Sequence, residues 1–170
     1  MNALDSQLQE REELNLAALI SDLAGRTGLT IATAECLTNG RIASRLGNAR
    51  HARSWFIGGI VADSIQVKRQ VLQVRASAIV SEQAAREMAV GTRTLFGADL
   101  CIAVTGGRDA GLDRAPGTVC FAIADRDGVL AETKHLPAAA HDSAGCATEH
   151  ALTMVRRRLT AHWQRYRSAS

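Results

Sequence analysis

A single cysteine stands where a strand-like run changes into a helical pattern. Residues 29–32 (LTIA) form a mainly apolar run with two β-branched residues, and residues 33–36 are small or polar and end in Cys36. Ile42, Ala43 and Leu46 then share a helix face. This order predicts a strand, a tight turn and a helix. A helix N-terminus carries unpaired N–H groups and partial positive charge, so we expect a lowered pKa and a nucleophilic thiolate at Cys36.

The elements that must position this turn alternate between helices and strands. The pattern predicts a helix from Glu10 to the glycines at 25–28, the strand–turn–helix unit at 29–46, a strand at 55–62 and a short helix after Asp63 or Ser64. A longer helix is expected at 82–96, with Ser81 as its N-cap and Gly97 as its end. A strand at 100–105, hairpin strands at 118–124 and 129–136, and a closing helix at 142–166 complete the order. The strand at 55–62 is expected to be buried on both faces, with Gly58 and Gly59 approached closely by a neighbour. The inner stripe of the helix at 82–96 is expected to be Ala85, Met88, Ala89, Thr92 and Leu95.

This order predicts an α/β fold, a three-layer α/β/α sandwich around a mixed, mostly parallel five-stranded sheet. We expect one domain over residues 1–170, with residues 1–9 as a loose lead-in. Ligands of such sheets bind beyond the carboxyl ends of the parallel strands. Three loops are therefore expected to meet there, at residues 33–39, 63–68 and 105–116.

The motifs in these loops resemble the CinA C-terminal domain family over nearly the whole chain, from about Leu14 to Leu159. The matching segments are 33–40 (TAECLTNG, against TAESCTGG), 58–68 (GGIVADSIQVK, against GGVVAYSNxxK), 80–99 (VSExxAxxMAxGxxxxxGAD), 104–106 (VTG), 116–119 (PGTV) and 149–152 (EHAL). The resemblance implies the sandwich fold. It also implies kinship with nicotinamide mononucleotide amidohydrolases of the PncC type.

The chain departs from the family pattern where the chemistry is expected. Cys36 replaces the family's serine, Asp63 replaces its tyrosine, and Asn39 replaces a turn glycine. Residues 107–110 replace the IAGP loop, and no arginine occurs between 126 and 156. The sequence therefore predicts the family scaffold with a rewritten site.

The resemblance and the loop positions together suggest two sets of site residues. In the catalytic set, Cys36 attacks a carboxamide carbon, Lys68 lowers its pKa or transfers protons, and Asp63 orients Lys68 or holds water. Thr105 hydrogen-bonds the substrate, and the backbone N–H groups of Leu37 and Thr38 form an oxyanion hole. The substrate-binding set is Glu35, Thr38, Gly40, Gly106 and Arg108. Two alternatives stay open: Lys68 as an ordinary surface lysine, and Glu35 as a buried carboxylate that satisfies turn N–H groups.

Charge and composition argue against nucleic acid and membranes as partners of this chain. The net charge is only +3, and its excess lies late in the chain, where a solvated helix end is expected: Arg156, Arg157, Arg158, Arg165 and Arg167. Six aromatic residues and no basic stretch between them argue against nucleic acid, and apolar runs of about seven residues argue against a membrane span.

We expect a cytoplasmic homodimer with reduced cysteines that binds a small, nucleotide-like molecule. Neither a cofactor nor a metal is expected, because Asp63, Asp109 and Asp113 fit no ligand spacing and the five histidines form no ligand-spaced pair. Two functions stay open. One is hydrolysis of a C–N amide bond in a pyridine nucleotide or similar amide, and the other is a non-catalytic small-molecule-binding or interaction protein on the same scaffold.

Overall fold

Five strands form one mixed sheet in the order β2-β1-β3-β4-β5. The computed structural model describes residues 3–107, 115–136 and 143–169. The elements in chain order are α1 (Ala3–Thr27), β1 (Ile31–Glu35), α2 (Arg41–Gly47), the 3₁₀ turn η1 (Ala52–Ser54), β2 (Phe56–Val61), α3 (Ile65–Gln70), α4 (Glu82–Phe96), β3 (Leu100–Gly106), β4 (Thr118–Asp125), β5 (Gly128–His135) and α5 (Ser143–Ala169). Strand β1 pairs in parallel with β2 and β3, while β4 pairs antiparallel with both β3 and β5.

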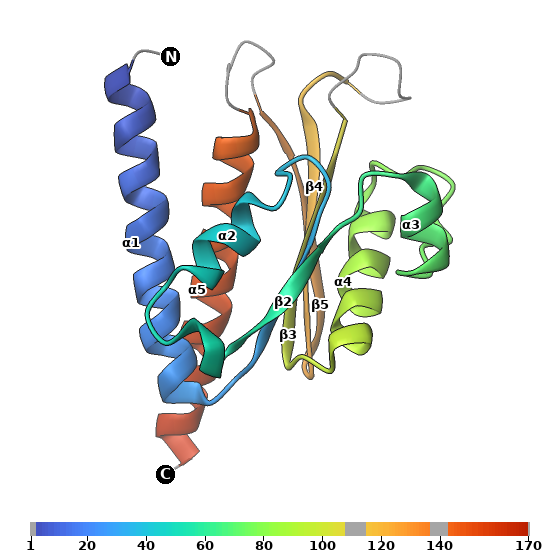
Figure 1. Cartoon of the computed structure of the whole chain (residues 1–170). Helices are drawn as coiled ribbons and strands as arrows, with labels where there is room; N and C mark the ends of the chain where they lie inside the picture. The colour runs from blue at the N-terminus through green and yellow to red at the C-terminus, as the bar shows by residue number, and fades with distance from the viewer. Residues whose placement is uncertain (1–2, 108–114, 137–142, 170) are drawn as a thin grey trace.

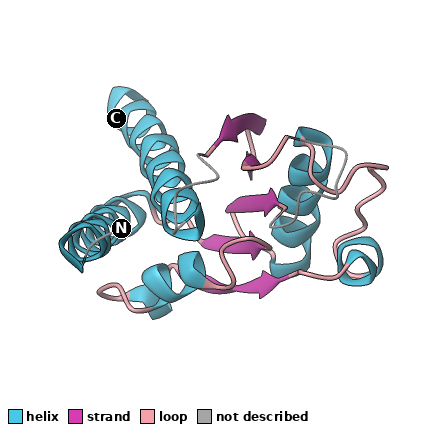
Figure 2. Ribbon diagram, turned by 90° about the horizontal axis from the view of Figure 1, so that it is seen from above, coloured by secondary structure: helices cyan, strands magenta, loops and turns pink. Residues whose placement is uncertain are grey.

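Helices cover both faces of the sheet, which confirms the α/β/α prediction. Helices α2 and α5 lie on one face with α1 packed against them, and α4 covers the other face with α3 beside it (Figure 1). The view from above shows the strands between these two groups of helices (Figure 2).

Side-chain size differs between the two faces of the sheet. Toward α5 the strands present large residues such as Ile102, Val104 and Phe121, all fully buried. Toward α4 they present Ala34, Ala103 and Ala122, which meet the alanines of α4. Small residues on both partners let the α4 backbone pack close to the sheet, so this layer depends on close contact rather than on bulky side chains.

Three element ends agree with the sequence. The Ser81 hydroxyl accepts the Ala84 N–H at 3.1 Å at the start of α4, and Gly97 ends the helix at φ 63°. The Ser64 hydroxyl accepts the Val67 N–H at 3.1 Å at the start of α3. These bonds satisfy N–H groups that a helix start otherwise leaves unpaired.

Three expectations differ from the structure. Strand β2 is an edge strand, so its residues alternate between half-buried and exposed instead of being buried on both faces. Leu95 is 55% exposed and lies outside the inner stripe of α4. Helix α1 begins at Ala3 rather than Glu10, because the lead-in residues continue the helix along α5, where Gln9 contacts Cys146.

Two glycines allow close backbone contacts. A Cβ at Gly59 would lie 2.1 Å from Thr33 Oγ1, as the expected close approach to residues 58–59 requires. A Cβ at Gly91 would lie 2.2 Å from the Leu72 carbonyl oxygen, so the segment after α3 packs directly on the α4 backbone. A larger side chain at either position would force the backbone apart.

Candidate active site

A thiol, an amine and a carboxylate meet at the carboxyl end of β1. Cys36 follows β1 directly, and its Sγ lies 3.4 Å from Lys68 Nζ and 3.3 Å from Asp63 Oδ1. Asp63 lies in the loop between β2 and α3, and Lys68 lies in the second turn of α3. The parallel pairing of β1 and β2 brings both segments to the same sheet edge, which is where the topology predicted them.

Lys68 is buried, so its interpretation as an ordinary surface lysine is wrong. Its exposure is only 1%, although it lies on a six-residue helix at the surface. A buried ammonium needs a polar partner, and the sulfur atom of Cys36 supplies one. Asp63 is exposed and connects the cluster to solvent.

The expected lowering of the Cys36 pKa is also wrong. Burial, which leaves Cys36 6% exposed, raises the pKa of its thiol; the Lys68 ammonium opposes this shift and the hydrogen bond to Asp63 adds to it. The resting side chain is therefore a thiol at neutral pH, with its S–H donated to Asp63.

Glu35 explains why the helix terminus does not activate the thiol. Its buried carboxylate accepts the backbone N–H groups of Ile42 at 3.1 Å and Ala43 at 2.7 Å, both in the first turn of α2. The positive end of α2 is thus already occupied by a negative side chain. This geometry supports the structural alternative for Glu35 over a role in binding substrate.

The rest of the turn is shaped around the same carboxylate. The Thr38 hydroxyl donates to Glu35 at 2.7 Å and is almost fully buried. Asn39 and Gly40 have φ of 51° and 85°, and Gly40 is the N-cap of α2. Asparagine tolerates such left-handed geometry, so it can stand at a position where the family pattern has glycine.

Two residues of β3 lie at the same end of the sheet. The Thr105 hydroxyl is buried and donates a hydrogen bond to the Ile79 carbonyl at 2.8 Å, so its proton is used within the protein and is not offered to a substrate. The Gly106 carbonyl lies 3.9 Å from Cys36 Sγ, and a Cβ at Gly106 would come within 3.1 Å of Leu37. Arg108, Asp109 and Asp113 lie outside the described residues.

The expected oxyanion donors are the backbone N–H groups of Leu37 and Thr38. Neither donates a hydrogen bond to another residue in the described part of the chain. Both residues are buried in the turn that carries Cys36.

A second polar cluster joins α5 to the β4–β5 hairpin, and no local sequence pattern predicted it. The Asp125 carboxylate accepts hydrogen bonds from Arg158 Nη2 and from His162 Nε2, each at 2.7 Å, and Arg165 pairs with Asp127. These two arginines are therefore bound to carboxylates, not simply solvated. Asp125, Asp127 and His162 lie close enough to share a metal ion, but the guanidinium groups already neutralise the carboxylates, so we interpret the cluster as a structural tie.

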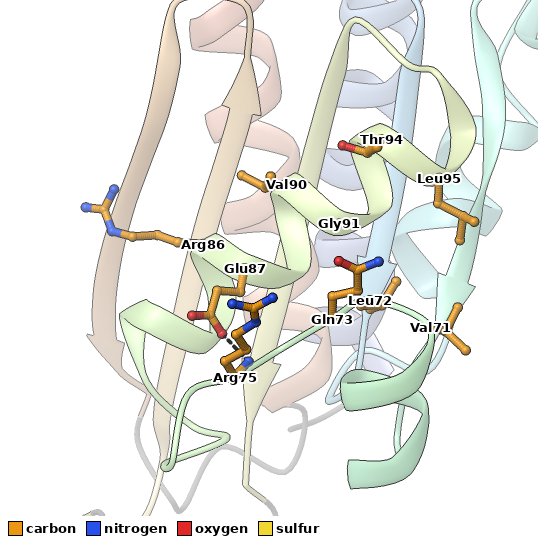
Figure 3. A pocket seen from close by; sticks show the side chains of 10 residues that line it. All are labelled: Val71, Leu72, Gln73, Arg75, Arg86, Glu87, Val90, Gly91, Thr94 and Leu95. Atoms are coloured by element: carbon orange, nitrogen blue, oxygen red, sulfur yellow. Dashed lines mark hydrogen bonds between the residues drawn. The ribbon is translucent and has the colours of Figure 1, made fainter.

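A groove of about 490 Å³ runs between α4 and the segment that follows α3. Figure 3 shows Val71, Leu72, Val90 and Leu95 along it, with Glu87 holding the Arg75 N–H. Cys36, Asp63 and Lys68 do not line this groove, which is therefore separate from the thiol cluster.

The fold and the cluster define a class: an α/β/α sandwich with a cysteine, a lysine and an aspartate at the carboxyl edge of its parallel strands. Residues 13–159 match the model of the CinA C-terminal domain. The chain belongs to this family.

Individual relatives agree with the family model. The chain is 40% identical over 157 residues to a CinA-like protein from Mycolicibacterium gilvum, covering 84% of this chain and 36% of that protein. It is 38% identical over 143 residues to a putative competence-damage inducible protein from Desulforudis audaxviator, covering 79% and 33%. The chain thus spans about a third of the length of these relatives.

Solved structures share the architecture. A CinA superfamily protein from Klebsiella pneumoniae superposes with a TM-score of 0.81 at 27% identity, covering 88% of this chain and 98% of that one. A competence/damage inducible protein from Agrobacterium tumefaciens gives 0.79 at 28% identity, covering 88% and 96%. Within the described residues, no helix has the length and apolar character needed to cross a bilayer.

Proposed function

We propose that this chain hydrolyses a C–N amide bond with Cys36 as nucleophile, Asp63 as general base and Lys68 as the cation that stabilises the thiolate. The observation that carries the proposal is the position of one sulfur atom within 3.4 Å of both an amine and a carboxylate. A nucleophile within hydrogen-bond reach of its base is the arrangement that covalent catalysis requires.

Cys36 loses its thiol proton while its sulfur attacks the substrate. Because the pKa of Cys36 is raised, the thiolate is not present beforehand, and Asp63 accepts the proton as sulfur approaches the carboxamide carbon. The Lys68 ammonium, held at the sulfur on its buried side, stabilises the negative charge as it develops.

The first half-reaction forms a thioester and releases ammonia. The new S–C bond gives a tetrahedral intermediate whose oxyanion accepts the Leu37 and Thr38 backbone N–H groups. The C–N bond then breaks, and the proton held by Asp63 passes to the departing nitrogen. Water, deprotonated by the same carboxylate, cleaves the thioester in the second half-reaction and restores the thiol.

The proposed substrate is a small molecule that carries a carboxamide, with nicotinamide mononucleotide as the first candidate. Membership of the family supports this choice, since nicotinamide mononucleotide amidohydrolases share the motifs quoted above. The cluster lies at the carboxyl edge of the parallel strands, where ligands of such sheets bind, and exposed Asp63 connects it to solvent. The homodimer expected from the sequence stays a prediction, which sedimentation analysis can check.

A binding protein without catalysis is the second candidate. The raised pKa of Cys36 and its small exposed area favour a thiol that contacts a ligand without attacking it. In that case Cys36→Ala still binds the ligand, with only the small loss of affinity that one lost contact causes.

Ammonia release separates the two functions. The purified chain is incubated with nicotinamide mononucleotide and a panel of pyridine carboxamides, and trapping at low pH is used to detect a thioester on the peptide that contains Cys36. We expect ammonia release that Cys36→Ala abolishes and Asp63→Asn lowers by about 10²–10⁴-fold. Absence of both ammonia and thioester across the panel, with ligand binding intact, would establish the binding protein instead.

A further inference from the structure

The thiol of Cys36 contacts a lysine, and lysine is rare in this chain. The chain has only two lysines, Lys68 and Lys134, against 18 arginines. Lys68 Nζ contacts Cys36 Sγ at 3.4 Å, while Lys134 lies on β5, where it pairs with Val119. An amine differs from a guanidinium in that it can lose its proton and act as a nucleophile, so this contact allows covalent chemistry.

We propose that a hydroperoxide oxidises Cys36 and that Lys68 then closes a reversible S–N cross-link with it. The cross-link uses the same two side chains as the proposed amidase and would switch that activity off. Its formation does not require the site to hydrolyse an amide.

The first step makes a sulfenic acid. Asp63 accepts the thiol proton, and the sulfur attacks the nearer oxygen of the peroxide. An S–O bond forms, the O–O bond breaks, and the leaving hydroxide (alkoxide, for an organic hydroperoxide) takes the proton from Asp63 to become water (or an alcohol). Sulfur is oxidised by two electrons and the peroxide is reduced by two.

The second step expels a further water. Lys68, as the neutral amine, attacks the sulfenic sulfur from its buried side; an S–N bond forms, the S–O bond breaks, and one N–H proton leaves with the hydroxide. The ammonium first loses a proton, which exposed Asp63, in contact with the same sulfur atom, passes to solvent. The net product has lost two hydrogens relative to the reduced protein, so its mass falls by about 2 Da.

Burial of the amine favours this cross-link over further oxidation. Lys68 is 1% exposed and already in contact with the sulfur, so the amine meets the sulfenic acid sooner than a second peroxide does. Two thiol equivalents reverse the link: each gives one hydrogen, the S–N bond breaks, and the two equivalents leave as a disulfide.

The remaining cysteines provide an internal comparison. The Cys101 thiol contacts the Ile102 carbonyl, and the Cys120 sulfur contacts the Thr133 hydroxyl. Cys146 receives an amide N–H from Gln9, which is not a nucleophile. A lysine amine contacts the sulfur of Cys36, so the lysine cross-link is expected there.

Peptide mapping of the full chain tests the proposal. The protein is treated with hydrogen peroxide, its remaining thiols are blocked, and it is digested with trypsin. We expect residues 27–41 and 54–69 joined in one ion with two hydrogens fewer than the separate peptides, and released by dithiothreitol. Lys68→Arg, which keeps the charge, and Cys36→Ser should both abolish this ion, whereas the matched Lys134→Arg variant should retain it.

Oxygen on Cys36 without a link to residues 54–69 would overturn the proposal, as would an equal yield of the ion in Lys68→Arg. The readout is a mass, so it is independent of turnover. A chain that forms the cross-link but releases no ammonia would disprove only the amidase, and an active amidase that shows no cross-link would disprove only this inference.

Discussion

The carboxylate of Glu35 accepts the backbone N–H of Ala43 at 2.7 Å, which joins the end of β1 to the first turn of α2. The same carboxylate accepts the Ile42 N–H and the Thr38 hydroxyl. The turn that carries Cys36 is therefore closed around one buried acid. The contacts of Glu35 stabilise the turn, whereas the adjacent Cys36 is the proposed nucleophile. Substitutions at the two positions therefore test stability and reactivity separately.

Replacement of Glu35 by glutamine should destabilise the fold. The amide has one acceptor oxygen instead of two, so at least one buried N–H or O–H loses its partner, at a cost of about 1–3 kcal/mol in the free energy of unfolding. Urea unfolding followed by circular dichroism measures the change. Thr38→Val removes only one donor and serves as the control, with a smaller loss of about 1 kcal/mol. Equal losses in the two variants would show that Glu35 does not organise the turn.

Alkylation of Cys36 should be slow at neutral pH and accelerate as pH rises. The thiolate reacts, and burial raises the pKa of Cys36, so the rate should increase about tenfold per pH unit up to and beyond the ordinary thiol range. Iodoacetamide labelling of the native protein, followed by mapping of the Cys36 peptide, measures it. Lys68→Met removes the opposing positive charge and should slow labelling further. A rate that is already constant at pH 7 would show a preformed thiolate.

Asp125→Asn should cost about 3–5 kcal/mol in the free energy of unfolding, because it removes the buried charge that half-buried Arg158 and buried His162 contact. Burial acts to raise the pKa of the Asp125 carboxyl, but the hydrogen bonds from Arg158 and His162 outweigh it and hold that pKa below its ordinary value.

The pH dependence of this contribution follows from the sign of the shift. A carboxyl with a lowered pKa in the folded state stabilises the fold above its unfolded pKa of about 4, and the contribution is lost as pH falls below that value. The difference in unfolding free energy between wild type and Asp125→Asn should therefore shrink in acid. A difference that stays constant from neutral pH down to the acid range would contradict this assignment.

Two glycines in helices should respond to alanine in opposite directions. A Cβ at Gly91 would meet the Leu72 carbonyl at 2.2 Å, so Gly91→Ala should destabilise the fold by about 1–3 kcal/mol. Gly25 in α1 has nothing within 4 Å, so Gly25→Ala should stabilise it by about 0.5–1 kcal/mol. Thermal unfolding of both variants is the measurement, and a shift of the same sign in both would refute the steric explanation.

Periodicity and turn chemistry predicted the elements of this fold because each depends on local sequence. Ser81, Gly97 and the hairpin at 125–128 are such signals, and the structure confirms all three. The exposure of β2 could not be predicted in this way, because an apolar run looks the same at the edge of a sheet as at its centre. The strand order decides between them, and it is a long-range property.

The sequence predicted the position of the candidate site, but it did not predict the direction in which the pKa of Cys36 is shifted. Topology brought Cys36, Asp63 and Lys68 to one edge, but a thiol pKa depends on how deeply the group is buried and on which acid occupies the helix end. Lys68 carried one unused signal, since lysine is scarce in this arginine-rich chain and the two side chains are not interchangeable. The Asp125 cluster joins residues more than 30 positions apart and gave no local pattern.

The three reactive side chains come from segments that meet only when β1 and β2 lie side by side in parallel. A chain that has formed its helices but has not yet paired these two strands has no reason to bring the sulfur, the amine and the carboxylate together. Chemical competence at residue 36 should therefore arise late in folding and vanish early in unfolding, which makes its reaction rate a sensitive gauge of the completeness of the native state.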